Sequence, residues 1–125
     1  MEKNKFYKIV VEFTEKCGLE YDETKELYKI CLDEITENCN NISKYYSKGM
    51  LNDVKSELHN IKGVSGSYLL ESVYNISKLI SEYVEVGSKL RFAVAVSDLK
   101  NELSDIRNNI DIVFNELELK SPKSQ

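Results

Sequence analysis

The residue type best suited to catalysis or group transfer occurs once in this chain, as His59. A lysine follows three positions later and a glycine four positions later, at Lys62 and Gly63. Residues three and four positions apart are neighbours on a helix, so both would flank the imidazole. A solvated imidazole is largely neutral near pH 7 and can act as a nucleophile without an activating base. The spacing therefore indicates a nucleophilic histidine, with an ammonium close enough to offset negative charge placed on the ring.

A stripe of apolar and small residues in the same segment predicts which way His59 points. The stripe follows helical spacing and consists of Val54, Leu58, Ile61 and Ser65. At about 100° per residue, His59 lies about 140° from the centre of this stripe, and Gly63 lies within about 40° of His59. The imidazole is therefore predicted to face solvent, with Gly63 on the same side.

Two glycines in one predicted helix need an explanation, because each costs about 1 kcal/mol relative to alanine. Residues without side chains at Gly63 and Gly66 would leave the imidazole uncovered and let another molecule approach the helix closely. We therefore predict an open docking surface around His59. Lys55 and Asn52, one and two turns earlier, are the candidates for its rim.

The run His59-Asn60-Ile61-Lys62-Gly63 resembles the His-x-[Leu/Ile]-Lys-Gly core of histidine-containing phosphotransfer (HPt) domains. This resemblance implies that His59 takes a phosphoryl group from an aspartyl phosphate on a receiver domain and passes it to another receiver's aspartate in a two-component phosphorelay. It implies that Lys62 favours the phosphoryl charge and that Gly63 keeps the histidine accessible. It also implies no kinase or phosphatase activity, no metal and no cofactor on this chain, with Mg²⁺ held by the partner receiver domain.

The same resemblance implies a short N-terminal helix followed by an antiparallel four-helix bundle, with the histidine on the second bundle helix. The chain can be divided in that way from Lys3 to about Leu119. Two places differ from the family's usual pattern. Val64 stands where a small residue is common, and Tyr68-Leu69 stands where a Leu-Gly pair commonly ends the histidine helix.

Hydrophobic periodicity predicts the helices without the family. Glycine or a polar cap marks most of the boundaries, with Gly18 ending the first helix, Asp22 capping the second, and Asn52 or Asp53 capping the third. The predicted helices cover about residues 3–16, 22–47, 53–68 and 70–86, and a long segment with a four-three repeat from Phe92 to Leu117. Short connections favour antiparallel neighbours. We therefore expect an all-α domain over residues 1–119, an antiparallel four-helix bundle with a short additional N-terminal helix, followed by a disordered polar tail at 120–125.

Two alternatives remain at this stage. The chain could be a helical adaptor or scaffold that binds partners through its bundle surface and never carries phosphate. The Phe92 to Leu117 repeat could instead pair two chains as a coiled coil. The other helices also carry apolar stripes and can supply partners within the chain, which favours a monomer.

Composition narrows the function classes. The 125 residues suffice for one domain, and a formal charge of −4 gives no general basic field, which argues against nucleic acid or an anionic membrane as the main partner. The three cysteines, Cys17, Cys31 and Cys39, form no Cys-x-x-Cys pair, and with one histidine there is no zinc-binding pattern. No segment reads as a signal peptide or membrane span. We expect a cytoplasmic protein with protein partners.

Overall fold

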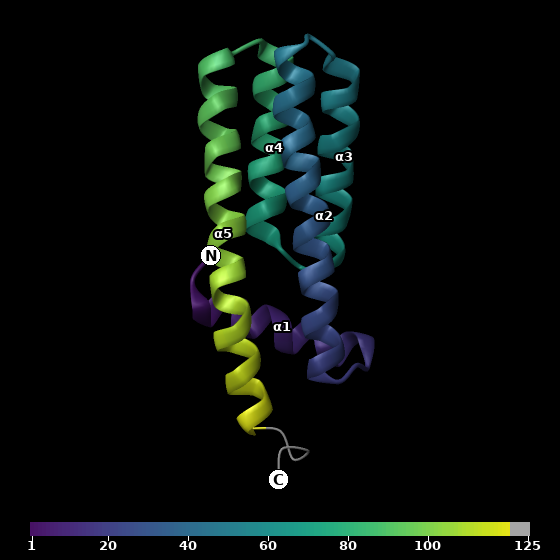
Figure 1. Ribbon diagram of the computed structural model, residues 1–125, viewed down its shortest axis with the longest axis vertical. Helices are drawn as coiled ribbons and strands as arrows, with labels where there is room; N and C mark the ends of the chain where they lie inside the picture. Colours follow the sequence, from purple (N-terminus) through teal and green to yellow (C-terminus); the bar gives the residue numbers. More distant parts are fainter. Residues whose placement is uncertain (121–125) are drawn as a thin grey trace.

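The computed structural model describes residues 1–120, and helices make up nearly all of that part (Figure 1). In chain order they are α1 (Lys3–Cys17), α2 (Tyr21–Ser47), α3 (Leu51–Ser67), α4 (Glu71–Val86) and α5 (Lys89–Lys120). No strand occurs among the described residues, so the expected all-α class is confirmed. The expected tail at 120–125 is wrong in its first residue, because Lys120 still belongs to α5; residues 121–125 lie outside the described residues.

Glycine ends α1, as the sequence predicts, and glycine also ends α4. Gly18 has φ +66° and Gly87 has φ +70°, a left-handed conformation that costs glycine little because it has no β-carbon. The main-chain N–H of each glycine donates back to a carbonyl of the last helical turn. Both chain reversals are therefore encoded locally.

The start of α2 differs from the prediction. The helix begins at Tyr21, so Asp22 lies inside its first turn and does not cap it. The N–H of Glu20 instead donates to the carboxylate of Glu23 at 3.0 Å, which is half of a capping box. A carboxylate in the first turn also suits the positive end of the helix dipole.

The start of α3 also differs, because the helix begins at Leu51 and places Asn52 and Asp53 within the first turn. Neither residue is the N-cap; that position belongs to Met50. The N–H of Met50 donates to the carbonyl of Tyr45 at 2.9 Å. This bond reverses the chain directly after α2, and α3 begins at Leu51, two residues before the predicted start at about residue 53.

Each of the four longest helices packs against two of the other three. α2 packs against α3 and α5, and α4 packs against the same two helices. Figure 1 shows these four helices side by side, with α1 lying across the lower part of α2 and α5. Every helix thus has an apolar stripe covered by at least two neighbours.

The long apolar repeat of α5 packs against other helices of the same chain. Its eight predicted positions are all buried: Phe92, Val96, Leu99, Leu103, Ile106, Ile110, Val113 and Leu117. They face α4 and α2 along most of the helix and α1 near its end. The seam that could have paired two chains is therefore filled by the other helices of the same chain.

An aromatic cluster packs α1 against α2. The ring of Tyr28 on α2 is fully buried and meets Phe6 and Phe13 of α1 edge-on, with centroids 5.5 and 5.3 Å away. The Tyr28 hydroxyl donates to the carbonyl of Tyr68 at 2.8 Å, which joins the end of α3 to the same cluster. Burial raises the pKa of Tyr28. The end of the molecule that carries α1 is thus closed by aromatic packing.

Candidate functional site

His59 lies midway along α3 and is exposed, as predicted. The opposite side of the helix holds it in place, since Val54, Leu58, Ile61 and Ser65 are at most 1% exposed. The buried Ser65 hydroxyl donates to the carbonyl of Ile61 at 2.6 Å, so it leaves no polar group unpaired in the core. The core stripe therefore fixes the rotation of α3 and directs the imidazole outward.

The surface beside His59 is open at both glycines. A β-carbon built at Gly63 or at Gly66 would meet no other atom within 4 Å. Close helix packing therefore does not explain either glycine, although each lowers helix stability by about 1 kcal/mol relative to alanine. What both positions provide is clear space next to His59.

Lys62 leans from α3 towards α4. Its ammonium donates to the hydroxyl of Ser81 at 3.4 Å, a long and therefore weak hydrogen bond. The Lys62 side chain is half-buried, and among residues 1–120 its ammonium forms no salt bridge. It lies one helical turn from the imidazole.

Lys55, on the other side of His59, has its charge balanced. Its ammonium pairs with the carboxylate of Glu85 on α4 at 2.8 Å. The hydrogen bond from Lys55, and then its charge, lower the pKa of Glu85. Asn52, the other predicted rim residue, is exposed one turn earlier on α3. Of the two lysines that flank His59, only Lys62 is free to balance a new negative charge.

Ser81 and Glu85 are the site residues that sequence reasoning missed. They come from α4, and nothing in the local pattern around His59 points to them. The packing of α4 on α3 brings them within reach of Lys62 and Lys55. The one feature of the sequence that relates these two residues is their spacing of four, which puts both on one face of their helix.

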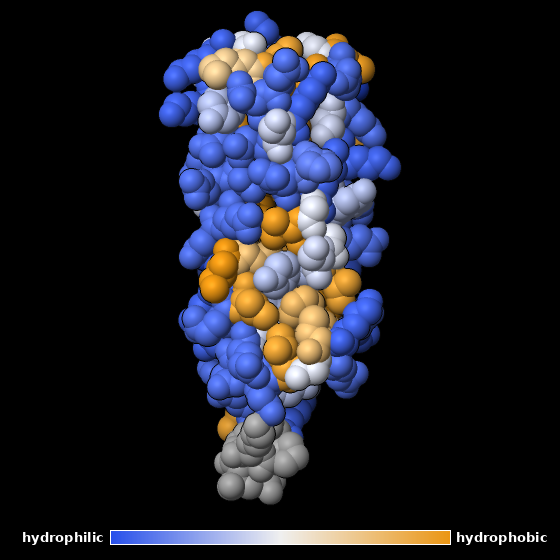
Figure 2. Space-filling model, turned by 90° about the vertical axis from the view of Figure 1, so that its right-hand side faces the viewer, coloured by the Kyte–Doolittle hydropathy of each residue, from blue (hydrophilic) through white to orange (hydrophobic). Residues whose placement is uncertain are grey.

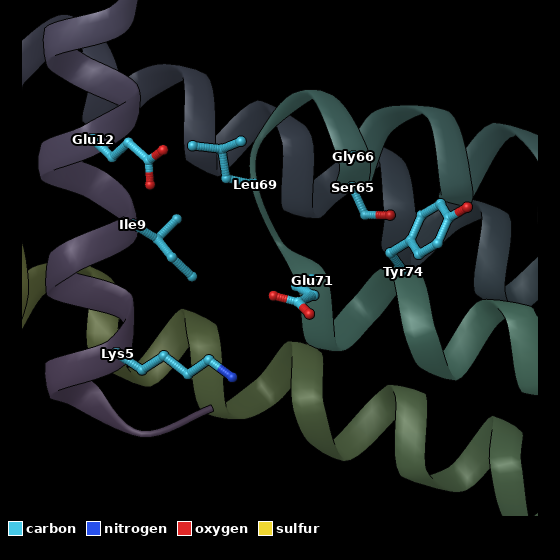
Figure 3. Close-up of a pocket in the computed structure, with 8 residues that line it drawn as sticks. All are labelled: Lys5, Ile9, Glu12, Ser65, Gly66, Leu69, Glu71 and Tyr74. Atoms are coloured by element: carbon cyan, nitrogen blue, oxygen red, sulfur yellow. The ribbon is translucent and has the colours of Figure 1, made fainter.

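A cavity of about 430 Å³ opens next to Gly66, where α1, α3 and α4 meet (Figure 3). Ile9 and Leu69 form apolar walls, and the side chains of Lys5, Glu12 and Glu71 lie around it. Its remaining lining residues are Ser65, Gly66 and Tyr74. The sequence did not predict this cavity, because its walls come from three separate helices.

Leu69 adopts an unusual backbone conformation in the wall of this cavity. Its φ is +59°, the only positive φ of a non-glycine residue in the described part of the chain. A side chain in this region costs about 1 kcal/mol, so a glycine would fit the turn better. This is the turn where HPt domains commonly carry Leu-Gly. The chain instead keeps an apolar side chain beside Gly66.

Figure 2 looks onto the side of the molecule where α3 lies and shows a hydrophobic area in its lower half, surrounded by hydrophilic residues. Tyr74 of the cavity wall is 39% exposed, and Ile9 and Leu69 are half-buried. Contiguous exposed apolar surface on a protein usually marks an interaction site. Gly66, which lines the cavity, lies beside partly exposed apolar side chains of the kind that protein partners contact.

The cysteines contribute no reactive group near this site. All three are free; Cys31 and Cys39 are buried, and burial raises the pKa of the Cys31 thiol to about 12. Among residues 1–120, no group of three or more His, Cys, Asp or Glu side chains is arranged to hold a metal ion. No helix in that range is long and apolar enough to cross a membrane.

Comparison with protein-family models, with curated proteins and with solved structures yields no match. The resemblance to HPt domains therefore depends on the sequence run at residues 59–63. The physical argument for a function depends on the geometry around His59.

Proposed function

We propose that this protein is a histidine phosphotransfer protein that carries a phosphoryl group on His59 between receiver-domain aspartates of a two-component phosphorelay. One observation supports this proposal above all others. His59 is exposed on a rigid helix, next to the open position Gly63 and one turn from Lys62, whose charge is unbalanced.

The fold we propose for this function is an antiparallel four-helix bundle of α2 to α5, with α1 as the short additional N-terminal helix. The closed circuit of contacts among α2, α3, α4 and α5 and the short connections between them support this arrangement. In that bundle His59 lies on the second helix. Packing of α3 against α2 and α4 fixes the helix that carries the imidazole.

The proposed chemistry needs no other nucleophile. A ring nitrogen of neutral His59 attacks the phosphorus of an aspartyl phosphate, and an N–P bond forms as the P–O bond to the receiver's aspartate breaks. The freed carboxylate stays on the receiver, and the second ring nitrogen releases its proton to solvent. The reverse sequence delivers the phosphoryl group to another receiver. Mg²⁺ and the acidic cluster that position the reacting oxygens belong to the receiver.

Lys62 stabilises the phosphoryl group by charge. A phosphoryl group on His59 adds negative charge about one helical turn from the Lys62 ammonium, which can leave its weak bond to Ser81 at little cost. Lys55 would have to give up its 2.8 Å ion pair with Glu85 to do the same. Lys62 is therefore the cation that responds first.

The receiver docks on the outward face of α3. Gly63 lets the receiver's active site reach His59, and Gly66 leads to the apolar cavity walls formed by Ile9, Leu69 and Tyr74. Apolar contact there supplies binding, while Asn52 and Lys55 form the polar rim at the other end of the site. The partners we propose are receiver domains of response regulators or of a hybrid histidine kinase, met by a monomer in the cytoplasm.

Phosphoryl transfer from a receiver tests this proposal. The purified protein and its His59→Gln variant are each incubated with several Mg²⁺-loaded, phosphorylated receiver domains, and label transfer is followed over time. We expect acid-labile label on the wild type and none on the variant. Absence of transfer from every receiver, with both proteins folded by circular dichroism, would refute the proposal.

A helical adaptor is the second candidate, because the apolar cavity at Gly66 could hold a partner without any phosphoryl chemistry. The two functions differ in what His59 does. An adaptor keeps its partner and its biological effect when His59 becomes glutamine, whereas a phosphotransfer protein keeps binding and loses its effect.

A further inference from the structure

Two chain reversals lie together at the end of the molecule away from α1 (Figure 1). One joins α2 to α3 and the other joins α4 to α5. The rings of Tyr46 and Phe92 stack there with centroids 3.7 Å apart. We call this region, residues 44–53 and 86–94, the turn end.

The turn end exposes apolar side chains that the core does not use. Ten large hydrophobic residues are exposed within residues 1–120, and half of them lie in this short region. They are Met50, Leu51, Val86, Leu90 and Val94. Val86 and Leu90 are the most open of these, at 72% and 76% exposed. Side chains this open at chain turns project from the molecular surface.

The same region is basic within an acidic protein. It holds four of the chain's 17 basic residues and one of its 21 acidic residues, Asp53. The four basic residues are Lys44, Lys48, Lys89 and Arg91, all exposed. Within the described part of the chain, none of the four forms a salt bridge. The net charge of −4 therefore hides a local excess of positive charge.

We propose that the turn end binds an anionic lipid surface. Projecting apolar side chains can enter the boundary between headgroups and acyl chains, while the surrounding lysines and arginine meet anionic headgroups. The excess of acidic residues elsewhere would orient the molecule with this end towards the negative surface. A second copy of the chain, placed end to end, would bring the same four cations against each other.

This contact would leave the outward face of α3 free. His59 lies about two turns along α3 from Leu51, at the middle of the helix and not at its end. Lipid binding and phosphoryl transfer therefore use different surfaces, which adjoin at Asn52, a residue of both the docking rim and the turn end. The inference about the turn end does not depend on the proposed function.

Vesicle sedimentation tests the inference. The protein is mixed with vesicles of phosphatidylcholine alone or with about 30% phosphatidylserine. We expect binding only to the anionic vesicles, and a fall of about 10-fold in affinity when NaCl is raised from about 0.1 M to about 0.5 M. The double variant Val86→Ser/Leu90→Ser and the charge reversal Lys89→Glu/Arg91→Glu should each weaken binding by about 10-fold or more.

Matched controls use exposed residues away from the turn end. Ile112→Ser/Leu119→Ser removes two exposed apolar side chains of α5, and Lys8→Glu/Lys16→Glu reverses two exposed charges of α1. Both controls should bind like the wild type. Absence of binding to anionic vesicles overturns the inference, and so does equal loss in the controls. Light scattering that shows self-association lost in Val86→Ser/Leu90→Ser would also overturn it, because the apolar residues would then pair two copies.

Discussion

The two faces of α3 differ in almost every physical respect. The inward face is a continuous stripe of buried residues that packs against α2 and α4. The outward face carries His59, two glycines with open space above them, and a lysine whose charge has no carboxylate partner. Opposite faces of the same helix thus have different roles: the inward face stabilises the fold, and the outward face carries the residues suited to chemistry.

Burial on the inward face stabilises α3 enough to offset the two glycines of the outward face. Each exposed glycine costs about 1 kcal/mol, whereas burial of a leucine or isoleucine side chain gains about 1.5–3 kcal/mol. Leu58 and Ile61 alone therefore offset Gly63 and Gly66. Changes on the inward face should lower stability and leave transfer intact, while changes on the outward face should weaken receiver binding or transfer without lowering stability.

The largest effect on stability should come from Leu58→Ala. The side chain is 1% exposed, so its loss leaves a cavity and should lower the free energy of unfolding by about 2–5 kcal/mol, measured by urea denaturation. Phosphoryl transfer per folded molecule should stay as in the wild type. Ser56→Ala, an exposed change on the same helix, is the control and should shift stability by less than about 0.5 kcal/mol. A folded Leu58→Ala protein with slow transfer would break the division between the faces.

On the outward face, Gly63→Gln should reverse this pattern. Glutamine favours the helix over glycine, so stability should rise by about 0.5–1 kcal/mol, while the added side chain should weaken receiver binding by about 10-fold or more. Gly63→Ala is the matched control, with the same gain in stability and near-normal affinity, because its β-carbon meets nothing within 4 Å. Titration calorimetry measures both affinities. Unchanged affinity in Gly63→Gln would contradict the clearance argument.

Lys62→Ala should slow phosphoryl transfer by about 3–10-fold, because the phosphoryl charge on His59 loses a cation one helical turn away that forms no salt bridge within residues 1–120. Lys55→Ala is the natural comparison, since its charge is already paired with Glu85, and its effect on transfer should be smaller. Rapid-quench kinetics with one phosphorylated receiver measures both. Equal transfer rates in Lys62→Ala and the wild type would refute the role of Lys62.

The smallest effect concerns Lys55, whose ammonium is paired with the carboxylate of Glu85. The hydrogen bond and charge of Lys55 lower the pKa of Glu85, so their pair stabilises the fold above the pKa of this carboxyl in the unfolded chain. That contribution is lost as the pH falls through the lowered folded-state pKa, and it is small because Glu85 is exposed. Carboxyl NMR titration should show the pKa of Glu85 returning towards its usual range in Lys55→Ala and unchanged in Lys78→Ala. An unshifted Glu85 in the wild type would contradict this pairing.

Helical periodicity was enough to predict the inward faces. Leu58 in α3 and Leu103 in α5 are buried where the repeats predicted, because spacing along a helix decides which side chains share a face. The exact starts of α2 and α3 could not be predicted from cap residues. They depend on the Glu20 to Glu23 hydrogen bond and on the backbone bond from Met50 to Tyr45.

For the candidate site, the sequence predicted only what lies on α3 itself. The outward position of His59 and the open space at Gly63 follow from the rotation of one helix. Ser81, Glu85 and the cavity at Gly66 depend on how α4 and α1 pack against α3. No spacing within one segment contains that information.

The most direct test of the central claim is to locate the phosphoryl group on the protein. After transfer from a phosphorylated receiver, the protein is kept at alkaline pH, at which phosphohistidine survives, and the modified residue is mapped by tandem mass spectrometry and ³¹P NMR. The account predicts one phosphoryl group per molecule, bound through nitrogen to His59 on the outward face of α3. Modification at another residue, or none in a folded protein that binds the receiver, would contradict it.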